Sequence, residues 1–438
     1  MIRKSRYCIL FQKGKEYLAY TSAKNSFYKI NRQVADFIEN FKSDEFDVSK
    51  NQLAKDIEHL HKIALISTEK EDDDVVDNIK LRYLINSFSK ETISVTLAPT
   101  IWCNLRCPYC FEESKPKDVM CDDICDKVLK FIEAHTSAKN LYLIWYGGEP
   151  LLGAKPIKYF LSKLDNLENI KLARHGMITN GTLLKGSNLD LFREKHLDSI
   201  QITIDGNKDT HDKKRIRPDG KGTYDEIIEN LKVFAKEYPN TVINIRVNID
   251  RNNVSEFMDV YNRIKDMFPD KKNIFVSPGI LKACGAQSFD SPFLNNAEIL
   301  NIRKEFRKKG YPVFYPDIRT GGCAATCITG YVIGPLGEIY KCWKDVGIKD
   351  KIVGNVCDMT ITNSNLLSEY MLHGSHITET SCHSCPVFPI CDSDCAFDRL
   401  ENAFHGQQNE FCCVYKEKDN EGLISMLSDL YERMPQRE

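Results

Sequence analysis

The sequence has almost no excess of charge of either sign. Its 438 residues include 60 Lys and Arg against 62 Asp and Glu, which gives a net charge of −2. Proteins that bind nucleic acid or an anionic membrane electrostatically carry a strong basic excess, so we expect neither partner. The sequence also lacks an apolar run that could span a membrane, and the apolar run at residues 8–11 is too short for a signal peptide.

Without an export signal, the cysteine content stands out. Seventeen cysteines are a high and odd number, and in a reducing compartment cysteines bind metal more often than they form disulfides. The composition therefore predicts a cytoplasmic protein with metal centres. Its length suggests roughly three domains of about 150 residues each, and 42% hydrophobic residues are enough to fill their cores.

Three of the cysteines lie close together on one short segment. Cys103, Cys107 and Cys110 have the spacing Cys-x3-Cys-x2-Cys, with Tyr109 directly before the last one. Thiolates are the usual ligands of iron–sulfur clusters, and three of them leave one iron of a four-iron cluster open for a small molecule. A zinc site that lacks one ligand is the alternative. The spacing resembles that of the radical S-adenosylmethionine (SAM) superfamily, which places an aromatic residue at the position of Tyr109.

Residues 90–310 alternate strand-like and helix-like segments, a pattern that favours parallel strands joined by crossover helices. The candidate strands are Ile93–Leu97, Leu141–Trp145, Leu172–Ile178, Ser199–Ile204, Val242–Ile249 and Ile274–Ser277. Six such units fit an α/β fold, a partial (β/α)6 TIM-like barrel. Chemistry in barrels collects on the loops at the C-terminal ends of the strands, and the cysteine loop follows the first candidate strand.

A glycine-rich turn, Gly147-Gly148-Glu149-Pro150, follows the second candidate strand. Glycines let a backbone approach a ligand, and a carboxylate accepts hydrogen bonds from an ammonium group. The turn resembles the Gly-Gly-Glu-Pro motif of the same superfamily, which holds the methionine amine of SAM. The resemblance implies that the cofactor-binding residues are Tyr109, Gly147, Gly148, Glu149, Asn180, Thr203, Asp205 and Arg215.

Among these residues, Arg215 is expected to pair with the SAM carboxylate. Arg246 and Asn248 on the fifth candidate strand are weaker candidates for SAM contacts. Turn and surface roles are the alternative for Asn180, Thr203 and Arg215.

Residues 311–438 contain a second group of cysteines. The run Cys382-x2-Cys385-x5-Cys391-x3-Cys395, preceded by Cys342 and followed by Cys412 and Cys413, resembles the SPASM domain, which holds two auxiliary [4Fe-4S] clusters. The resemblance implies a first cluster on Cys342 and Cys395 with Cys323, Cys327 or both. It implies a second on Cys382, Cys385 and Cys391 with Cys412 or Cys413, and Cys412 is preferred. A zinc ribbon is the alternative.

Residues 1–85 predict a small separate module. Strand-like runs at 7–11 and 17–20 flank Gly14 and suggest a hairpin. Helical spacing follows at Ile30, Val34, Phe37 and Ile38 and again at Leu53, Ile57, Leu60 and Ile63. The acidic run at 69–74 suggests a solvated linker. This order, a hairpin followed by small helices, resembles a winged-helix module that binds a leader peptide as an added edge strand. An ordinary stabilising domain is the alternative.

Together these features resemble radical SAM/SPASM maturases of ribosomally made peptides. The resemblance implies an oxidoreductase that cleaves SAM reductively to a 5′-deoxyadenosyl radical and modifies a precursor peptide, for example by forming a thioether cross-link. It implies as partners that peptide, with its leader, and an electron donor of the flavodoxin or ferredoxin type. The sequence does not indicate the peptide, the modified residue or the bond.

Two other functions remain open. Anaerobic sulfatase-maturating enzymes share both cysteine-rich regions and generate formylglycine. They place an aspartate directly after the cysteine that corresponds to Cys342, whereas here Asp345 comes three residues later. A non-catalytic iron–sulfur electron carrier is the third possibility, although a carrier has no need of the glycine-rich turn on a barrel loop.

Overall fold

The chain forms two compact units in a computed structural model. The structure describes residues 1–42, 51–112, 115–281, 292–312, 323–391, 395–404 and 421–433. The terminal unit comprises Met1–Phe88, Pro312–Cys323 and Met371–Glu438, and the barrel unit comprises Ser89–Tyr311 and Ala324–Tyr370. The three predicted domains are thus distributed over two units, and the first shares its unit with the end of the third. Within the described ranges, no helix has the length and apolar character needed to cross a membrane.

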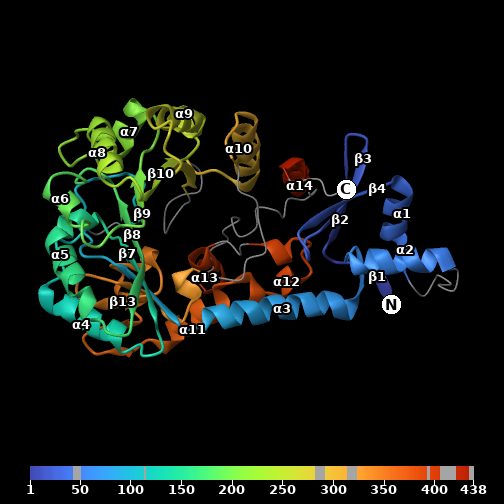
Figure 1. The fold of residues 1–438 in the computed structure, drawn as a ribbon, viewed down its shortest axis with the longest axis horizontal. Helices are drawn as coiled ribbons and strands as arrows, with labels where there is room; N and C mark the ends of the chain where they lie inside the picture. The colour runs from blue at the N-terminus through green and yellow to red at the C-terminus, as the bar shows by residue number, and fades with distance from the viewer. Residues whose placement is uncertain are drawn as a thin grey trace. The chain divides into compact units, whose positions relative to one another are not determined.

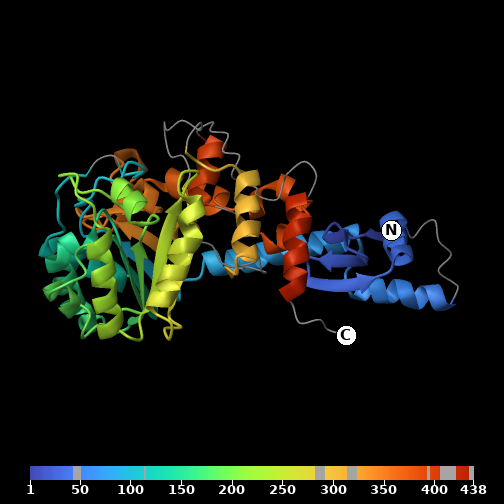
Figure 2. The same ribbon diagram turned by 90° about the horizontal axis from the view of Figure 1, so that it is seen from above.

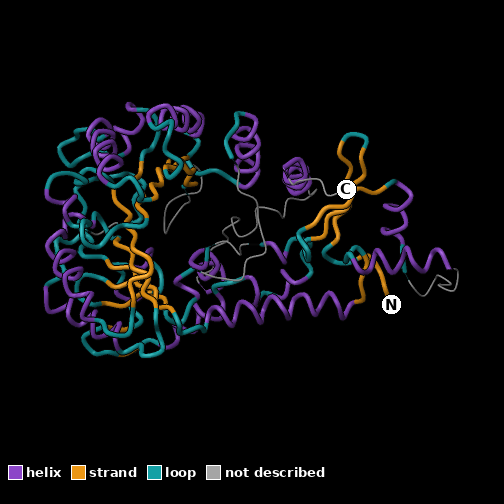
Figure 3. The backbone as a smooth tube through the Cα atoms, in the orientation of Figure 1, coloured by secondary structure: helices purple, strands orange, loops and turns teal. Residues whose placement is uncertain are grey.

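The barrel unit is built on parallel strands, as predicted. They are β6 (Thr92–Leu97), β7 (Asn140–Trp145), β8 (Lys171–Thr179), β9 (Ser199–Thr203), β10 (Val242–Ile249) and β11 (Ile274–Ile280). Each pairs in parallel with the next along the sheet. The helices of this unit lie outside the curved sheet (Figures 1 and 3). They are α4 (Asp122–Glu133), α5 (Ala154–Lys163), α6 (Ser187–Asp190), α7 (Lys208–Lys214), α8 (Tyr224–Glu237), α9 (Phe257–Met267) and α10 (Asn296–Lys308).

The strand pattern separates an apolar face from a polar one. In β10, Ile243, Ile245 and Val247 are fully buried, whereas Asn244 and Arg246 alternate with them and are only partly buried. Side chains alternate between the two faces of a strand. Because the helices cover the apolar face, the polar residues of β10 point to the inside of the barrel, which therefore suits a polar ligand.

A short hairpin extends the sheet beyond β6. β12 (Gly330–Ile333) pairs in parallel with β6, with Ile333 opposite Leu97. β13 (Glu338–Tyr340) runs antiparallel to β12, and β14 (Gly354–Asn355) and β15 (Thr360–Ile361) complete the sheet. The helix α11 (Ser364–His373) follows. The hairpin thus places β13, the strand before Cys342, one strand away from β6, which leads to the first cysteine loop.

The N-terminal part of the terminal unit is a small antiparallel sheet of β2 (Cys8–Lys13), β3 (Glu16–Thr21) and β4 (Ser26–Ile30). The predicted hairpin joins β2 to β3, and Gly14 at its turn has a φ of +58°. The predicted helices are α1 (Arg32–Asn40) and α2 (Asn51–Lys62), but Ile30 ends β4 rather than beginning a helix. β1 (Ile2–Lys4) pairs with β5 (Ile66–Thr68). The winged-helix assignment stays a prediction.

Both faces of this sheet are covered. Residues of α1, α2 and β5, including Ile38, Ile57 and Ile66, pack with Ala19 on one side. On the other side, Leu18 packs with Ile390 and with residues of α14 (Glu421–Arg433), including Leu423 and Leu427 (Figure 2). The N-terminal sheet and the C-terminal cysteine-rich segment therefore share one hydrophobic core.

The prediction of a solvated linker at residues 69–74 is wrong. These residues begin α3 (Glu69–Ser87), where Thr68 and Glu71 form a capping box. Acidic residues at a helix N-terminus interact favourably with the helix dipole. Asp72 is buried because its carboxylate accepts hydrogen bonds from Ser5 Oγ at 2.8 Å and Ser67 Oγ at 2.7 Å. The acidic run therefore anchors the helix to β1 and β5.

Candidate functional site

The first cysteine loop leaves the C-terminal end of β6, as predicted. Cys103 is buried, and Cys107 and Cys110 are partly buried. Hydrogen-bond donors already point at two of the sulfurs: the Asn180 side-chain amide lies 3.9 Å from Cys103 Sγ, and Lys115 Nζ lies 3.0 Å from Cys110 Sγ. Such donors stabilise anionic thiolates, so the residues present fit the three ligands of an iron–sulfur cluster.

In the metal-free protein, burial makes these thiols weaker acids than an exposed cysteine. Desolvation raises the pKa of Cys103 to about 12, and it also raises the pKa of Cys107. Metal must therefore displace protons when it binds. The described part of the chain contains no three His, Cys, Asp or Glu side chains that converge on a single metal ion.

The two glycines of the predicted turn pack directly against the cysteine loop. A Cβ atom on Gly148 would lie 2.2 Å from the carbonyl oxygen of Ile101, and one on Gly147 would lie 2.3 Å from that of Thr100. The amide of Gly148 donates to the Thr100 carbonyl at 3.2 Å. Glycine is thus required here because two backbones touch, and the contact fixes the start of the cysteine loop.

Glu149 organises the neighbouring loop from a fully buried position. Its Oε1 accepts hydrogen bonds from Thr179 Oγ1 at 2.8 Å and from the amide of Leu151 at 3.1 Å. Its Oε2 accepts from the amide of Asn180 at 2.8 Å. Burial raises the pKa of Glu149, and these donors oppose the rise. The carboxylate thereby joins the ends of β7 and β8, and its predicted contact with SAM stays a prediction.

Three of the predicted cofactor-binding residues form one buried network. The Tyr109 hydroxyl donates to the Asp205 carboxylate and accepts from Arg215 Nη1 at 2.9 Å. Arg215 and Asp205 form an ion pair at 3.7 Å. Burial raises the pKa of Tyr109, so the hydroxyl keeps its proton and can donate. Thr203 lies at the last position of β9, level with Arg246 of β10.

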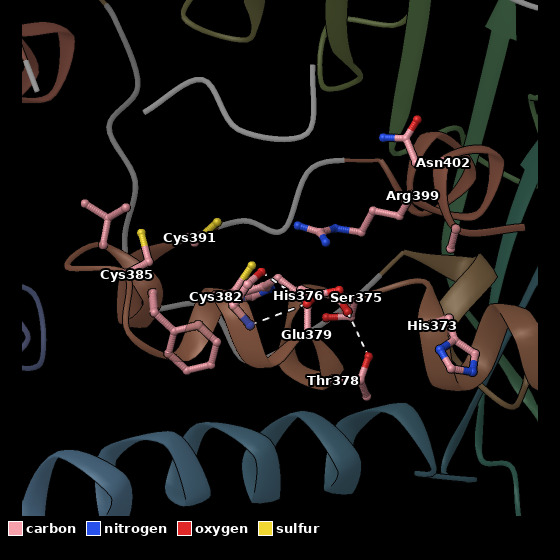
Figure 4. A pocket seen from close by; sticks show the side chains of 14 residues that line it. His373, Ser375, His376, Thr378, Glu379, Cys382, Cys385, Cys391, Arg399 and Asn402 are labelled. Carbon is pink, nitrogen blue, oxygen red and sulfur yellow. Dashed lines mark hydrogen bonds between the residues drawn. The ribbon is translucent and has the colours of Figure 1, made fainter. Parts of the chain in front are cut away.

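The second cysteine group surrounds a cavity in the terminal unit. Cys382, Cys385 and Cys391 line a cavity of about 380 Å³ (Figure 4). It lies near α12 (Thr380–His383) and α13 (Ala396–Phe404). The three cysteines thus line one cavity, and their role as ligands of the second auxiliary cluster stays a prediction. Cys412, its predicted fourth ligand, and Cys413 lie outside the described residues.

The cysteines of the predicted first auxiliary cluster belong to different units. Cys323 and Cys395 are in the terminal unit, and Cys327 and Cys342 are in the barrel unit. Within the barrel unit, the buried Lys341 donates to the carbonyl of Cys327 at 2.6 Å. The residue next to Cys342 thus holds the Cys327 backbone in place, while the complete ligand set stays a prediction.

Asp345 is the aspartate nearest to Cys342 in the sequence. It is fully buried, and its Oδ2 accepts a hydrogen bond from the Tyr370 hydroxyl at 2.6 Å. Its amide donates to the carbonyl of Cys342 at 3.1 Å. These hydrogen bonds hold Asp345 next to Cys342 and to Tyr370.

Two residues near the first cysteine loop were not found from the sequence. Lys115 also donates to the carbonyl of Glu112 at 2.8 Å. Burial raises the pKa of Glu112 to about 7, although Lys115 lowers it. Neither residue belongs to a motif, and only their position within five residues of Cys110 could have drawn attention to them.

Comparisons with known proteins agree with this geometry. Residues 97–264 match the family model described as the Radical SAM superfamily. The chain is 25% identical over 359 residues to a cysteine-type anaerobic sulfatase-maturating enzyme of Clostridium novyi (strain NT), covering 72% of this chain and 90% of that protein. It is 24% identical over 360 residues to a serine-type enzyme of Bacteroides thetaiotaomicron, covering 72% and 85%.

Solved structures show the same fold. The structure titled "Native anSMEcpe with bound AdoMet and Cp18Cys peptide" has a TM-score of 0.61 at 20% identity and covers 78% of this chain and 100% of that one. Streptococcus suis SuiB bound to S-adenosylmethionine has a TM-score of 0.50 at 14% identity, covering 90% and 95%. The family match includes both the cysteine loop and the glycine-rich turn, and the protein is a radical SAM enzyme that uses SAM and a [4Fe-4S] cluster.

Proposed function

We propose that this radical SAM enzyme modifies a ribosomally made precursor peptide, forming a cross-link such as a thioether. The main support is the terminal unit, in which a small sheet with an open edge shares its core with the cysteine-rich segment. A related solved structure is titled as holding a peptide together with SAM. The polar interior of the barrel also suits a peptide backbone, which needs hydrogen-bond partners when it is buried.

The chemistry balances for a cross-link. Cys103, Cys107 and Cys110 would hold a [4Fe-4S] cluster, which would supply the one electron needed to cleave SAM to methionine and a 5′-deoxyadenosyl radical. The peptide then loses two hydrogen atoms in total when a carbon–heteroatom bond forms. One becomes part of 5′-deoxyadenosine, and the other leaves as a proton and an electron. A flavodoxin- or ferredoxin-type protein is the proposed source of the first electron.

The proposed role of the N-terminal sheet is to bind the leader of the precursor peptide. β4 pairs with β3 on one side, and among the described residues no strand pairs with its other side. An unpaired edge offers backbone donors and acceptors that an extended peptide can extend. β2, the other edge, also has no second strand partner among the described residues, and α14 contacts both edge strands, through Lys13 and Glu432 at β2 and through Phe27 and Tyr431 at β4. We assign the leader to β4, with β2 as the alternative edge.

The second proposed component is a pair of auxiliary [4Fe-4S] clusters. The cavity lined by Cys382, Cys385 and Cys391 supports one of them; for the other, Lys341, which precedes Cys342, donates to the carbonyl of Cys327 and so links two of the proposed ligand segments. Closed clusters of this kind carry electrons. They would give the second electron of the reaction a route out of the site.

Formylglycine formation is the second candidate function. The curated relatives named as sulfatase-maturating enzymes cover 72% of this chain, which favours it. The buried and hydrogen-bonded Asp345 does not support it. The two functions differ in their product, because formylglycine carries an aldehyde and a cross-link does not.

The deciding experiment uses the anaerobically reconstituted enzyme with SAM, dithionite and candidate peptides encoded beside its gene. Formation of 5′-deoxyadenosine together with a peptide that has lost two hydrogens and does not react with a hydrazide would support a cross-link. A hydrazide-reactive product would support formylglycine. Hydrogen exchange with the bound peptide should show protection at residues 26–30; protection confined to residues 8–13 or to the barrel would contradict the β4 assignment.

A further inference from the structure

One histidine of the barrel unit lies next to the network of Tyr109, Asp205 and Arg215. His211 belongs to α7 and is fully buried. Its Nδ1 accepts a hydrogen bond from the amide of Asp205 at 3.2 Å, and its Nε2 lies 3.1 Å from Thr223 Oγ1. The ring therefore bridges the loop that follows β9 and the residue directly before α8, and both of its nitrogens have a partner.

The partners fix the position of the proton on this ring. A backbone amide can only donate, so Nδ1 carries no proton and Nε2 carries the one proton of the neutral ring. Burial, and after it the charge of Arg215, lowers the pKa of His211 to about 3, which agrees with a neutral ring. Nε2 therefore donates to Thr223 Oγ1. The Thr223 hydroxyl in turn donates to the carbonyl of Arg215 at 2.8 Å.

This chain of hydrogen bonds joins the backbones of Asp205 and Arg215. His211 holds Asp205 directly through Nδ1 and holds Arg215 through Thr223. The side chains of Asp205 and Arg215 then meet, because they form an ion pair at 3.7 Å and both contact the Tyr109 hydroxyl. One imidazole thus sets the spacing between two residues whose side chains must converge on a third.

The helix alone does not hold Arg215 firmly. α7 has only seven residues and no side-chain cap at its N-terminus, and Arg215 follows it with a non-helical φ of −117° and ψ of 65°. A helix this short is marginal by itself, so contacts from outside it fix its end. Thr223 is a rigid partner, since its amide donates to Asp212 Oδ1 at 2.7 Å. The bond from His211 to Thr223 therefore ties the end of α7 to the start of α8.

We propose that His211 is a positioning residue of the SAM site. It acts through Asp205 and Arg215, which it holds at the spacing that the contacts with Tyr109 require. Arg215 Nε is buried and has no hydrogen-bond partner among the described residues, so a donor is left for a bound ligand. The inference rests on the use of SAM and on the predicted contact of Arg215 with it, and it is independent of the peptide.

The first test follows backbone amides in the metal-free protein. His211→Leu removes both hydrogen bonds of the ring, so hydrogen exchange should become about tenfold faster in the segment that contains the Asp205 amide. His211→Asn carries an oxygen on the carbon that bears Nδ1, keeps an acceptor for this amide and should exchange like the wild type. Thr223→Val should also leave the Asp205 amide protected. Unchanged exchange in His211→Leu would overturn the proposal.

The second test measures the dissociation constant of SAM with the anaerobically reconstituted enzyme. His211→Asn and Thr223→Val both remove the bond between the two side chains. Each should weaken SAM about fivefold, as expected for one neutral hydrogen bond. The double variant should also lose about fivefold, because the two changes remove the same interaction. A loss of about 25-fold, the product of two independent effects, would contradict the proposed chain of hydrogen bonds.

A second buried histidine of the same unit serves as the matched control. His175 is 1% exposed, and its ring contacts Trp145 and the carbonyl of His196. His175→Leu should lower thermal stability and leave SAM binding unchanged, and iron content shows which variants are loaded. If His175→Leu weakens SAM as much as His211→Leu does, the effect is general destabilisation. If loaded His211→Leu and Thr223→Val bind SAM like the wild type, His211 has no positioning role.

Discussion

The hydroxyl of Tyr7 donates a hydrogen bond to the carbonyl of His383 at 2.8 Å. This bond joins the first residues of the chain to the segment that carries Cys382 and Cys385. Tyr7 also packs with Phe388 and Ile377 in a shared core. Deleting residues 1–85 would therefore disturb the cysteine-rich segment as well as the proposed leader site, so loss of activity after deletion would not identify a leader site.

The shared core predicts that a change in the N-terminal sheet exposes distant cysteines. Leu18→Ala removes a fully buried side chain and should cost about 2–5 kcal/mol. Thiol labelling of Cys382 and Cys385 in the metal-free protein should become faster, as mass spectrometry can measure. Leu231→Ala, equally buried in α8 of the barrel unit, is the matched control. Equal labelling rates in the two variants would argue against the shared core.

Gly148→Ala should displace the first cysteine loop. The new Cβ would lie 2.2 Å from the Ile101 carbonyl oxygen and 2.5 Å from that of Trp102, and backbone atoms cannot move away as a side chain can. We expect loss of most of the iron at Cys103, Cys107 and Cys110 and of 5′-deoxyadenosine formation. Gly220→Ala, at an exposed turn where φ is +82° and no atom lies within 4 Å, strains only its own turn and should keep both. Full iron content in Gly148→Ala would contradict the assigned contact.

Lys115→Met should make the SAM-binding cluster harder to reduce. Its ammonium donates to Cys110 Sγ at 3.0 Å, and donors to sulfur favour the reduced, more negative cluster. For a one-electron couple, each lost 1.4 kcal/mol corresponds to about 59 mV. An EPR-monitored redox titration should show a more negative midpoint potential, whereas Lys158→Met on the exposed side of α5 should not. An unchanged potential would mean that the contact is absent in the loaded enzyme.

His175 should make the metal-free protein less stable in acid. Burial lowers its pKa to about 4, although its backbone contacts raise it. Its Nδ1 lies 3.0 Å from the His196 carbonyl and its Nε2 accepts from Trp145 at 2.8 Å, an arrangement that requires the neutral ring. The unfolded state binds a proton below about pH 6.5, and the native state does so only near pH 4. Stability is therefore lost as the pH falls through this window, by up to about 3 kcal/mol.

Denaturant unfolding at pH 7 and pH 5 measures this dependence. His175→Gln should be less stable at pH 7 but should lose less stability on acidification than the wild type. His59→Gln, at an exposed position of α2, should follow the wild type. The assignment fails if His175→Gln and the wild type lose the same stability between the two pH values.

The positions of the barrel strands could be predicted from the sequence because apolar runs and the turns between them are local signals. The start of α3 was missed even though Thr68 and Glu71 form a readable capping box. The burial of Asp72 could not be predicted, because it depends on a hydrogen bond from Ser5, which is 67 residues away in the sequence. The same limit applies to the contact of Tyr109 with Asp205, which are 96 residues apart. Motifs identified Tyr109 and Asp205, but the contact between their side chains depends on the order of the strands in the sheet.

The pairing of β12 with β6 has a consequence for electron transfer. β6 ends directly before the first cysteine loop, and β13, the partner of β12, ends at Tyr340, two residues before Cys342. Backbone hydrogen bonds between adjacent strands thus set the separation of Leu97 and Tyr340, the strand ends from which the two cysteine segments start. Electron tunnelling depends steeply on distance, so a cluster on Cys342, as proposed above, would be reached from strand ends that the sheet holds at a fixed spacing. A change in either cysteine loop can alter the ligands of a cluster without altering how far apart the two loops begin.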